Sequence, residues 1–480
     1  MNPNMVTWKD YEGIEGFGVT SGDEVSELNK ALEAGNDINP PGPPWAAGDG
    51  FALRVESLEA TLRVTTYRME HIVFWRNCPK LAAYNTIEEH NILSSYSDNA
   101  DTGWMAEGAL PEADDSTYER GYATVKYMGT TRRVTHPMTL IRPAHGNVVA
   151  QETVNGTMKL LRLVERALFY GDSSLSSLQF DGFFKLIQDL APASNVIDLR
   201  GRPLSEDVLM DAALTIFDLP NVGVPTDLYL NPKTKTDLVK SFFPKARYDQ
   251  LQHTNEGMIG LDIKGFTSPA GDVRFQPDVF INDGGGATGA VGDAAKRPGA
   301  PTPGAVTTPV DAASKFEAED AGDYFYTAQA VNRYGRSAAV DVVAGPTAVT
   351  VAAGDKVTFT LTPGAGGDVD WYEIFRTKKD GASGTERLIL RVPNAAGAGA
   401  QTIDDFNENL PGTTMAGMFQ QNMESMSIKQ LAPMVKIPLA TIDTSVRWAQ
   451  VIYLVPVLYA PGKNVVFKNI GRAEGYVGAP

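Results

Sequence analysis

The chain has 480 residues and carries 42 Lys and Arg against 58 Asp and Glu, which gives a formal net charge of -16 at neutral pH. No long basic run is present to bind phosphates, so sequence-specific DNA recognition is not expected. The single cysteine, Cys78, excludes an intrachain disulfide, and no apolar run approaches the about 18 residues of a membrane span. We therefore expect a soluble protein of about three domains, made in a reducing cytoplasm.

The first 86 residues have the composition of an extended arm. The segment "NPPGPP" lacks backbone donors at its prolines and favours extended backbone. A short helical pattern at "LRVESLEATLRV" is followed by "HIVFWRNCPKLAA". We expect the aromatic side chains of the second segment, Phe74 and Trp75, to hold the arm against a neighbouring surface.

Residues 87–137 predict a long two-stranded ribbon. Its limbs, "NTIEEHNILSSYS" and "YERGYATVKYMGTTRRVTH", flank a polar, acidic stretch. The alternation from Tyr122 to Tyr127 is typical of a strand with two similar faces. Limbs of about 18 residues would extend about 60 Å. An isolated ribbon is only marginally stable in water, so we expect another subunit to cover it.

A long amphipathic helix is predicted next, in "HGNVVAQETVNGTMKLLRLVERALFYGD". Its apolar side chains recur at helical spacing, at Val154, Met158, Leu161, Val164 and Leu168. A helix of about 24 residues would be about 36 Å long. We predict that Gly171 ends it in a left-handed conformation and that the serines at 173–177 form a turn.

The second half of the chain alternates between two compositions. Residues 204–296 mix helical and strand patterns, including "SEDVLMDAALTIFD", "DLYLNP" and "PKTKTDLVKSFF", and predict a compact α+β unit. Residues 297–413 have only β patterns between Gly- and Pro-rich joints, which predicts an inserted all-β module. The end offers two strands around the Pro461–Gly462 turn.

No catalytic constellation emerges from the motifs. The glycines of "GFGVTSG" and of 284–286 lack the flanking elements of a nucleotide loop, and the serines lack the Gly-x-Ser-x-Gly pattern of a nucleophile elbow. The 5 histidines show none of the short spacings that hold a metal. The acidic cluster at 112–115 has the pattern of a solvated loop. We expect no catalytic, cofactor or metal site, and no enzyme activity.

The order of parts resembles the tailed-phage major capsid protein family, which has the Hong Kong 97-type α+β fold. "WMAEGALPEADDSTYERGYATVKYMGTTRRVTH" is similar to its extended loop and "ALFYGDSSLSSLQFDGFFKLI" to the end of its spine helix. "LYLNPKTKTDLVKSFF" is similar to its axial domain and "VLYAPGKNVVFKNIG" to its closing peripheral strands. The implied parts are an N-terminal arm (1–86), an extended loop (87–137), spine helix and peripheral domain (138–203), axial domain (204–296 and 414–447), the insertion (297–413) and C-terminal peripheral strands (448–480).

The insertion resembles fibronectin type III and immunoglobulin-like modules. "DYFYTAQAVNRYGRS" is similar to a late strand with Tyr324 or Tyr326 at the tyrosine corner, and "VDWYEIFRT" to the strand that carries the core tryptophan, here Trp371. The late-strand motif precedes the tryptophan strand, which departs from the usual order. We therefore expect a β-sandwich without assigning its topology.

The resemblance implies an icosahedral head shell that encloses double-stranded DNA without sequence readout. The implied partners are copies of the chain in hexamers and pentamers, a portal, a separate scaffolding protein and, as an open alternative, a decoration protein; no membrane is implied. The protein would be made in the bacterial host cytoplasm and reside in the virion capsid. The alternatives are an encapsulin-like compartment and a cell-surface adhesin. The expected subunit contacts are Phe74, Trp75, Trp104, Glu107, Tyr118, Tyr122 and Tyr127.

Some members of the family join subunits by a lysine–asparagine isopeptide bond near the tip of the extended loop. The presumed tip, "PEADDSTYERG", contains no lysine, and Lys126 lies well down the strand. The short arm also leads us to expect a separate scaffold and little N-terminal cleavage. Particles boiled in SDS with reductant should therefore release a band near 51.7 kDa. A ladder of resistant oligomers would contradict non-covalent assembly, and a much smaller band would contradict an uncleaved subunit.

Overall fold

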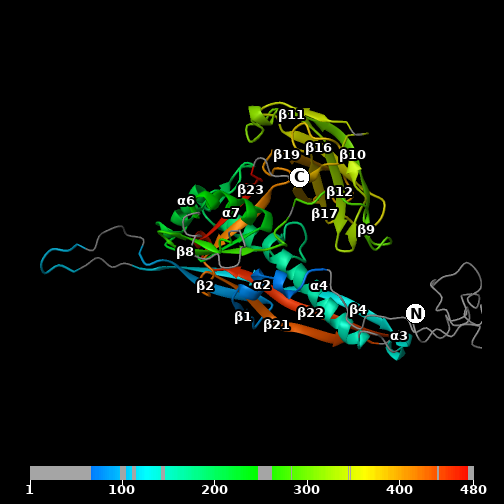
Figure 1. Ribbon diagram of the computed structural model, residues 1–480, viewed down its shortest axis with the longest axis horizontal. Coiled ribbons are helices and arrows are strands. Elements are labelled where there is room, and N and C mark those ends of the chain that lie inside the picture. Colours follow the sequence, from blue (N-terminus) through cyan, green and yellow to red (C-terminus); the bar gives the residue numbers. More distant parts are fainter. Residues whose placement is uncertain are drawn as a thin grey trace, which may run out of the picture. The chain divides into compact units, whose positions relative to one another are not determined.

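The computed structural model describes residues 66–97, 104–110, 115–141, 146–246, 262–282, 284–343, 345, 347–440 and 443–473. Within these residues, the chain forms two mixed sheets with helices, a two-stranded ribbon and an all-β segment, and each of the two mixed sheets combines strands from distant parts of the sequence (Figure 1). The protein therefore has the α+β character that the sequence predicts. The short elements are the 3-10 turns η4 (Met69–His71), η5 (Ala193–Asn195), η7 (Ala318–Asp320) and η8 (Pro461–Lys463) and the helices α2 (Phe74–Asn77) and α3 (His136–Leu140).

The first sheet has four strands in the order β1-β21-β22-β4. Only the β1–β21 pair is parallel. The strand bounds are Lys80–Ala82 for β1, Met426–Pro438 for β21, Ser445–Leu458 for β22 and Lys126–Thr135 for β4. Helix α4 (Val148–Tyr170) packs against β4 and β22. The contact is close at Gly156, where a Cβ would lie 1.8 Å from Oε1 of the buried Gln450.

The predicted long helix is confirmed. Helix α4 has 23 residues and buries Leu161, Val164 and Leu168 of the predicted apolar face, although Val154 is exposed. The prediction of a left-handed Gly171 is wrong, because Gly171 does not have a positive φ. A Cβ at Gly171 would lie 2.4 Å from the carbonyl oxygen of Phe180, so the glycine allows two chain segments to approach closely.

The serines after α4 form a turn, as predicted. Ser173 donates from its backbone N to Oδ1 of Asp181 at 2.7 Å, and its hydroxyl donates to Oδ2 at 2.9 Å. The Ser174 hydroxyl donates to Oδ1 of Asp172 at 2.6 Å. The turn leads into helix α5 (Phe183–Leu190). This stretch is therefore a structural joint between α4 and α5.

The second sheet has six strands in the order β5-β23-β20-β6-β8-β7. The strand bounds are Val196–Asp198 for β5, Asn464–Ile470 for β23, Thr414–Phe419 for β20, Asp227–Leu230 for β6, Gly271–Pro277 for β8 and Gly265–Ser268 for β7. Helices α6 (Glu206–Phe217) and α7 (Pro232–Ala246) accompany this sheet, and its apolar side chains form a separate core with those of α6 and α7. The predicted cap of α6 is present, since Oγ of Ser205 accepts from the backbone N of Val208 at 3.4 Å.

The strands on either side of Pro461–Gly462 do not form a hairpin. β22 belongs to the first sheet and β23 to the second, with η8 between them. β20 and β21 likewise lie in different sheets although they are close in sequence. The C-terminal part of the chain therefore crosses twice between the sheets and connects their cores.

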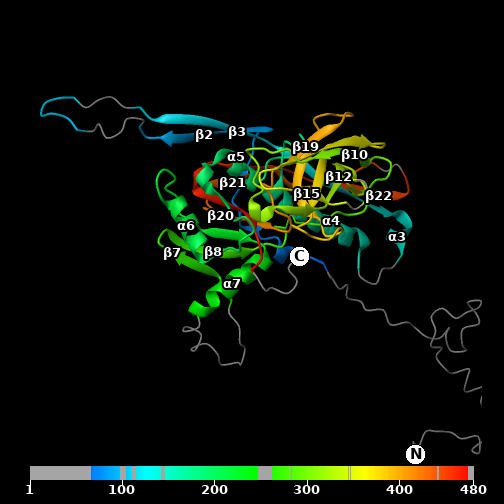
Figure 2. The same cartoon turned by 90° about the horizontal axis from the view of Figure 1, so that it is seen from above.

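The ribbon consists of β2 (Ile87–Ser95) and β3 (Thr117–Thr124), which pair antiparallel. The two strands lie side by side in both Figure 1 and Figure 2. The prediction of one continuous second limb is wrong, because β4 leaves the ribbon and pairs with β22. The break falls at Val125, which is buried and donates to the carbonyl of Thr86 at 2.8 Å. The paired part of the ribbon therefore extends about 30 Å.

Between the second sheet's strands β8 and β20, the described chain contains an all-β segment. Its strands are β9 (Val291–Gly292), β10 (Gly299–Thr307), β11 (Gly322–Tyr324), β12 (Tyr326–Asn332), β13 (Gly335–Arg336), β14 (Val340–Asp341), β15 (Val349–Val351), β16 (Val357–Gly364), β17 (Trp371–Arg376), β18 (Arg387–Pro393) and β19 (Gln401–Asp405). The larger sheets, β10-β16-β19 and β18-β17-β12-β13-β9, contribute side chains to one shared core. Since β9 pairs with β13, the segment includes residues before 297.

Trp371 does not occupy the core of this segment. Tyr372 and Ile374 are buried in the core, and strand alternation places Trp371 on the opposite face of β17. The prediction of Trp371 as a core tryptophan is therefore wrong, and the next residue, Tyr372, faces the core instead. The hydroxyl of Tyr324 donates to the backbone carbonyl of Asp320, four residues upstream, while the hydroxyl of Tyr326 donates to Oδ2 of Asp405.

Candidate subunit interface

The ribbon presents aromatic side chains to solvent. Tyr118 and Tyr122 of β3 are 72% and 77% exposed, and strand alternation places them on one face with Arg120 between them. Arg120 pairs with the exposed Glu89 of β2 at 3.2 Å. An exposed pair of this kind stabilises a fold very little. This face therefore combines large apolar area with weakly held charges, which suits contact with another surface.

The opposite face of the ribbon is fixed to the first sheet at its base. Glu88 pairs with Lys429 of β21 at 3.6 Å, and the His90 ring packs edge-on against Tyr459 with ring centroids 5.1 Å apart. Burial, together with the positive charge of Lys429, lowers the pKa of His90. His90 is therefore neutral at physiological pH and packs as a ring. The base of the ribbon has a defined contact, while the face with Tyr118 and Tyr122 has none among the described residues.

Three further predicted residues are also exposed. Trp104, which is 94% exposed, and Glu107 lie in the described part of the ribbon tip. The neighbouring residues 98–103 and 111–114 lie outside the described residues. Tyr127 of β4 is exposed although its ring meets the edge of Tyr453 at a centroid distance of 5.2 Å. These side chains are available for subunit contact, and their assignment to the interface stays a prediction.

Phe74 is not available for contact with another subunit, which corrects the prediction for this residue. Its side chain is 0% exposed and lies in the core of its own chain. It packs against rings from α4, α5, β6 and β20, with centroid distances of 4.7 Å to Phe169, 5.3 Å to Phe183, 4.9 Å to Tyr229 and 5.9 Å to Phe419. The sequence reveals that this segment is aromatic but not which ring turns inward.

Trp75, the neighbour of Phe74, is half-buried. Nζ of Lys80 lies 4.8 Å from its ring centroid and donates to the Trp75 carbonyl. The indole therefore keeps part of its surface open. The rest of the predicted arm, residues 1–65, lies outside the described residues.

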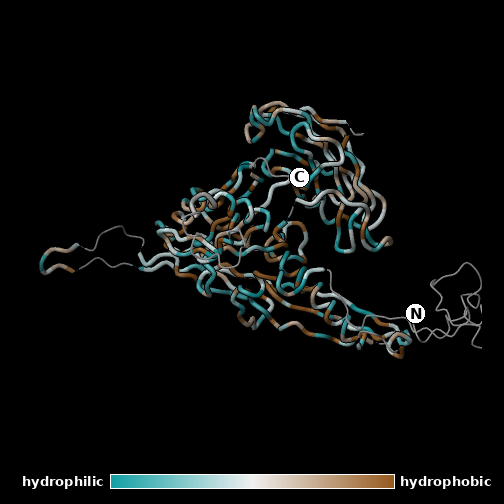
Figure 3. Tube along the Cα trace, viewed as in Figure 1, coloured by the Kyte–Doolittle hydropathy of each residue, from teal (hydrophilic) through white to brown (hydrophobic). Residues whose placement is uncertain are grey.

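Two exposed apolar patches were missed by the sequence reasoning. The first, which we call the sheet-end patch, lies at α3 and the adjoining ends of β21 and β22, where Figure 3 shows hydrophobic stretches. It comprises Met138, Leu140, Ile141, Val435, Ile437, Leu439 and Val446. The second, the α6 patch, comprises Leu214, Phe217, Leu219, Val222 and Val224. The apolar residues of "PMTLI" and "KIPLA" were the available signal in the sequence.

The described residues contain no group of His, Cys, Asp and Glu side chains arranged to hold a metal ion. None of the described helices has the length and apolar character required to cross a membrane.

Comparison with known proteins indicates the class of protein. No protein-family model matches the chain. The chain is 26% identical over 462 residues to the major capsid proteins of Staphylococcus phage S25-3 and Staphylococcus phage K, and the alignment covers 92% of this chain and 95% of each relative. The similarity therefore extends along nearly the whole length of both proteins.

Solved structures also align with most of the chain. A structure from Gordonia phage Cozz has 10% identity and a TM-score of 0.45, covering 90% of this chain and 98% of that chain. An encapsulin complex from Synechococcus elongatus PCC 7942 has 9% identity and a TM-score of 0.36, covering 87% and 95%. These scores are too low to carry an argument, so the functional conclusion rests on the sequence relatives.

The relatives point to a protein that forms part of a capsid. The function predicted from the sequence is confirmed: this is a bacteriophage major capsid protein, with a structural role in the virion capsid.

We predict that Phe74→Ala acts on folding of the subunit. Removing a ring from a buried aromatic cluster should lower the free energy of unfolding by about 3–5 kcal/mol. Urea unfolding of the purified, unassembled subunit, followed by circular dichroism, measures this change. The control Trp104→Ala removes an aromatic side chain from an exposed site and should change stability by less than about 0.5 kcal/mol. Equal effects of the two substitutions would show that Phe74 is not a core residue.

Proposed function

We propose that the protein is the subunit of the icosahedral head of a tailed double-stranded DNA bacteriophage and has the Hong Kong 97-type fold. The ribbon carries this proposal. A two-stranded ribbon is marginally stable alone, and the face with Tyr118 and Tyr122 has no covering element among the described residues. A second copy of the chain supplies the missing surface in hexamers and pentamers, and closed symmetry then produces a shell.

The two sheets suggest which elements form each domain of the capsid fold. In this assignment, β2 and β3 form the extended loop, α4 is the spine helix, the first sheet belongs to the peripheral domain and the second sheet to the axial domain. The sheet-end patch and the α6 patch then lie on different domains and face different neighbours. The sequence predicts the boundary between the axial domain and the C-terminal peripheral strands at residue 447. We place β21 in the peripheral domain instead, because β21 pairs with β22 while β20 pairs with β23.

The charge of the chain supports an enclosing role. A net charge of -16 disfavours tight binding to DNA phosphates. Packaged DNA therefore meets the inner wall without readout, and a portal and a separate scaffolding protein direct packaging and assembly. The subunit is made in the bacterial host cytoplasm. The phage role is favoured over the encapsulin-like alternative because the sequence relatives that span the chain are phage major capsid proteins.

The all-β segment is proposed to be an immunoglobulin-like module displayed on the outer surface. Its own apolar core and the hydrogen bond of Tyr324 to the backbone of Asp320 support this assignment. A buried ion pair adds rigidity, since Nη1 of Arg376 donates to Oδ2 of Asp405 at 2.6 Å and Tyr326 donates to the same oxygen at 2.9 Å. The function of the module is open between attachment to glycans or cells and reinforcement of neighbouring subunits.

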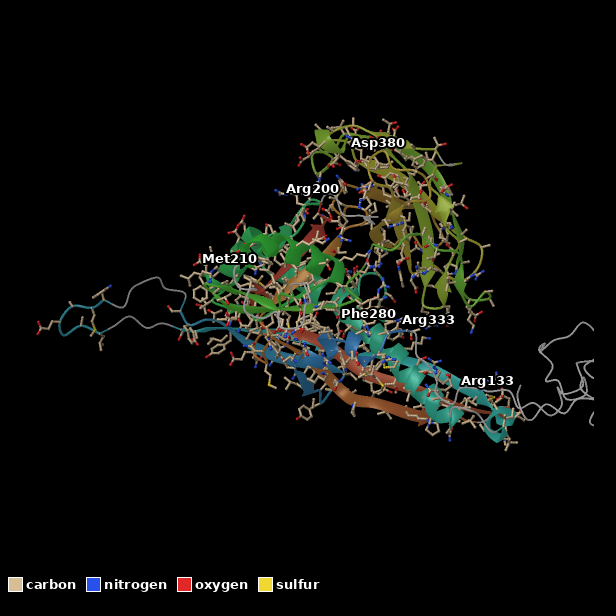
Figure 4. All side chains as sticks on the ribbon, in the orientation of Figure 1. Arg133, Arg200, Met210, Phe280, Arg333 and Asp380 are labelled. Carbon is tan, nitrogen blue, oxygen red and sulfur yellow. The ribbon has the colours of Figure 1, made fainter. Side chains whose placement is uncertain are left out.

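The module is also tied to the second sheet by specific contacts. Arg200, which follows β5 and is labelled in Figure 4, donates to the carbonyl oxygens of Asn407 at 2.8 Å and Lys315 at 2.7 Å. It also pairs with Asp320 at 3.0 Å. The segment before β9 is bonded as well, since the backbone N of Leu388 donates to the carbonyl of Gly285 at 3.1 Å. A displayed module held in this way keeps a fixed orientation on its subunit.

Assembly tests the proposed function. Negative-stain imaging of the protein assembled together with its scaffolding protein should show closed shells, and the double variant Tyr118→Ser, Tyr122→Ser should remain as unassembled subunits or capsomers with unchanged thermal stability. Tyr334→Ser changes an exposed tyrosine of the module and should assemble like the natural protein. A protein that stays monomeric under all assembly conditions would refute the shell role. Normal shells from the double variant would refute the role of the ribbon.

A further inference from the structure

A buried carboxylate fixes the segment before α2 to helix α4. Glu165 of α4 is 0% exposed. Its Oε1 accepts from the backbone N of Phe74 and its Oε2 from the backbone N of Trp75, both at 2.7 Å. These donors are the first N–H groups of the short helix α2, so Glu165 holds the place where the described part of the arm enters the core.

A second buried carboxyl group, that of Asp278, interacts with Glu165 and contributes to the raised pKa of Glu165. Asp278 follows β8 and is also 0% exposed. Its Oδ1 accepts from the backbone N of Phe280 at 2.8 Å, and its own backbone N donates to the carbonyl of Leu230 at 2.9 Å. Its Oδ2 is buried without a hydrogen-bond partner among the described residues. Phe280, labelled in Figure 4, packs edge-on against Tyr67 with ring centroids 5.7 Å apart. The pair thus links α4, the arm segment and the chain that leaves the second sheet.

The surrounding charges do not compensate two buried negative charges. The basic group that acts on Glu165 is Lys80, whose Nζ donates to the carbonyls of Trp75 and Cys78 instead of to either carboxylate. Burial raises the pKa of Cys78 to about 12 and also raises the pKa of Tyr229, so both groups are neutral. Two adjacent buried carboxylates without a bonded cation are strongly unfavourable, and the usual resolution is that one of them retains a proton.

We propose that Glu165 and Asp278 share one proton at neutral pH and that loss of this proton releases the Phe74–Trp75 segment from helix α4. The unpartnered Oδ2 of Asp278 is the position that such a proton satisfies, because an O–H there donates to Glu165. Glu165 then keeps both of its oxygens for the backbone N–H groups of Phe74 and Trp75. The junction is a proton-dependent latch between the arm segment and the two sheets.

The direction of the pH dependence follows from the raised pKa values. Burial first, and then the hydrogen bond with Asp278, raises the pKa of Glu165 to about 9, and burial also raises the pKa of Asp278. The folded state therefore holds the shared proton at pH values where the unfolded chain has lost it. The contribution of the latch to stability is complete in acid, decreases as pH rises above the ordinary carboxyl range and is lost as pH passes about 9.

Hydrogen exchange of the full-length protein between pH 6 and 10 tests the latch. Protection of the Phe74 and Trp75 amides, corrected for the intrinsic rate at each pH, should fall by about tenfold per pH unit from pH 6 to about 9, where only the closed state holds the shared proton, and should level off at higher pH. A peptide from β23 serves as the reference for global unfolding. In Asp278→Asn the amide donates permanently to Glu165, so protection should stay constant over this range. The matched control Glu70→Gln removes an exposed carboxylate of the same segment and should behave like the natural protein.

Several outcomes would overturn the proposal. Constant protection in the natural protein, or the same decline in Asp278→Asn, would show that the pair does not control the segment. A loss of protection at pH 7 on addition of EDTA would show that a bound cation, not a proton, joins the carboxylates. If Asp278→Asn does not fold, infrared spectra of the natural protein decide the question. A protonated carboxyl band at pH 7 that disappears between pH 8 and 10 is expected, and its absence at pH 7 would refute a shared proton.

Discussion

The packing of aromatic rings around Phe74 is the constraint on which the rest of this structure depends. The ring belongs to a segment near the start of the described chain, yet its contacts come from α4, α5, β6 and β20. Since β6 and β20 belong to the second sheet while α4 packs on the first, one cluster of side chains joins both sheets. Each aromatic side chain buries a large apolar area, so this junction sets the arrangement of the parts around it.

The same arrangement determines what remains exposed. The buried Val125 directs β4 into the first sheet and leaves β2 and β3 to continue as a ribbon. The ribbon base is held by Glu88 and His90, while Tyr118 and Tyr122 belong to none of the three hydrophobic cores. In the function that we propose, such a subunit folds around its own core and completes its apolar packing with other copies.

Local patterns predicted the regular elements well. The 23 residues of α4, the Ser205 cap of α6 and the β6–α7 unit depend on neighbours within a few positions, which a sequence displays directly. The break at Val125 was missed because the alternation of side chains continues through it, and only burial in a distant core reveals the bend. Trp371 was placed on the wrong face for a similar reason, since an alternating strand does not state which of its two faces is inside.

For most of the candidate interface residues, exposure to solvent could be predicted from the sequence. Trp104, Glu107, Tyr118, Tyr122 and Tyr127 are exposed in the structure, while the inward turn of Phe74 depends on rings up to several hundred positions away, such as Phe419. The sheet-end patch escaped notice because it forms only when β21, β22 and α3 come together. Aromatic residues in a polar stretch of sequence therefore indicate a candidate contact region. Whether each ring faces the core of its own chain or another subunit depends on contacts with residues distant in the sequence.

A cryo-electron microscopy map of the assembled particle is the most direct test of the claim that one aromatic core builds the subunit and leaves the ribbon to its neighbours. We expect the rings of Tyr118 and Tyr122 to contact another subunit, and the ring of Phe74 to be enclosed by residues of its own chain. A ribbon face open to solvent throughout the shell, or a Phe74 ring packed against another subunit, would contradict the account.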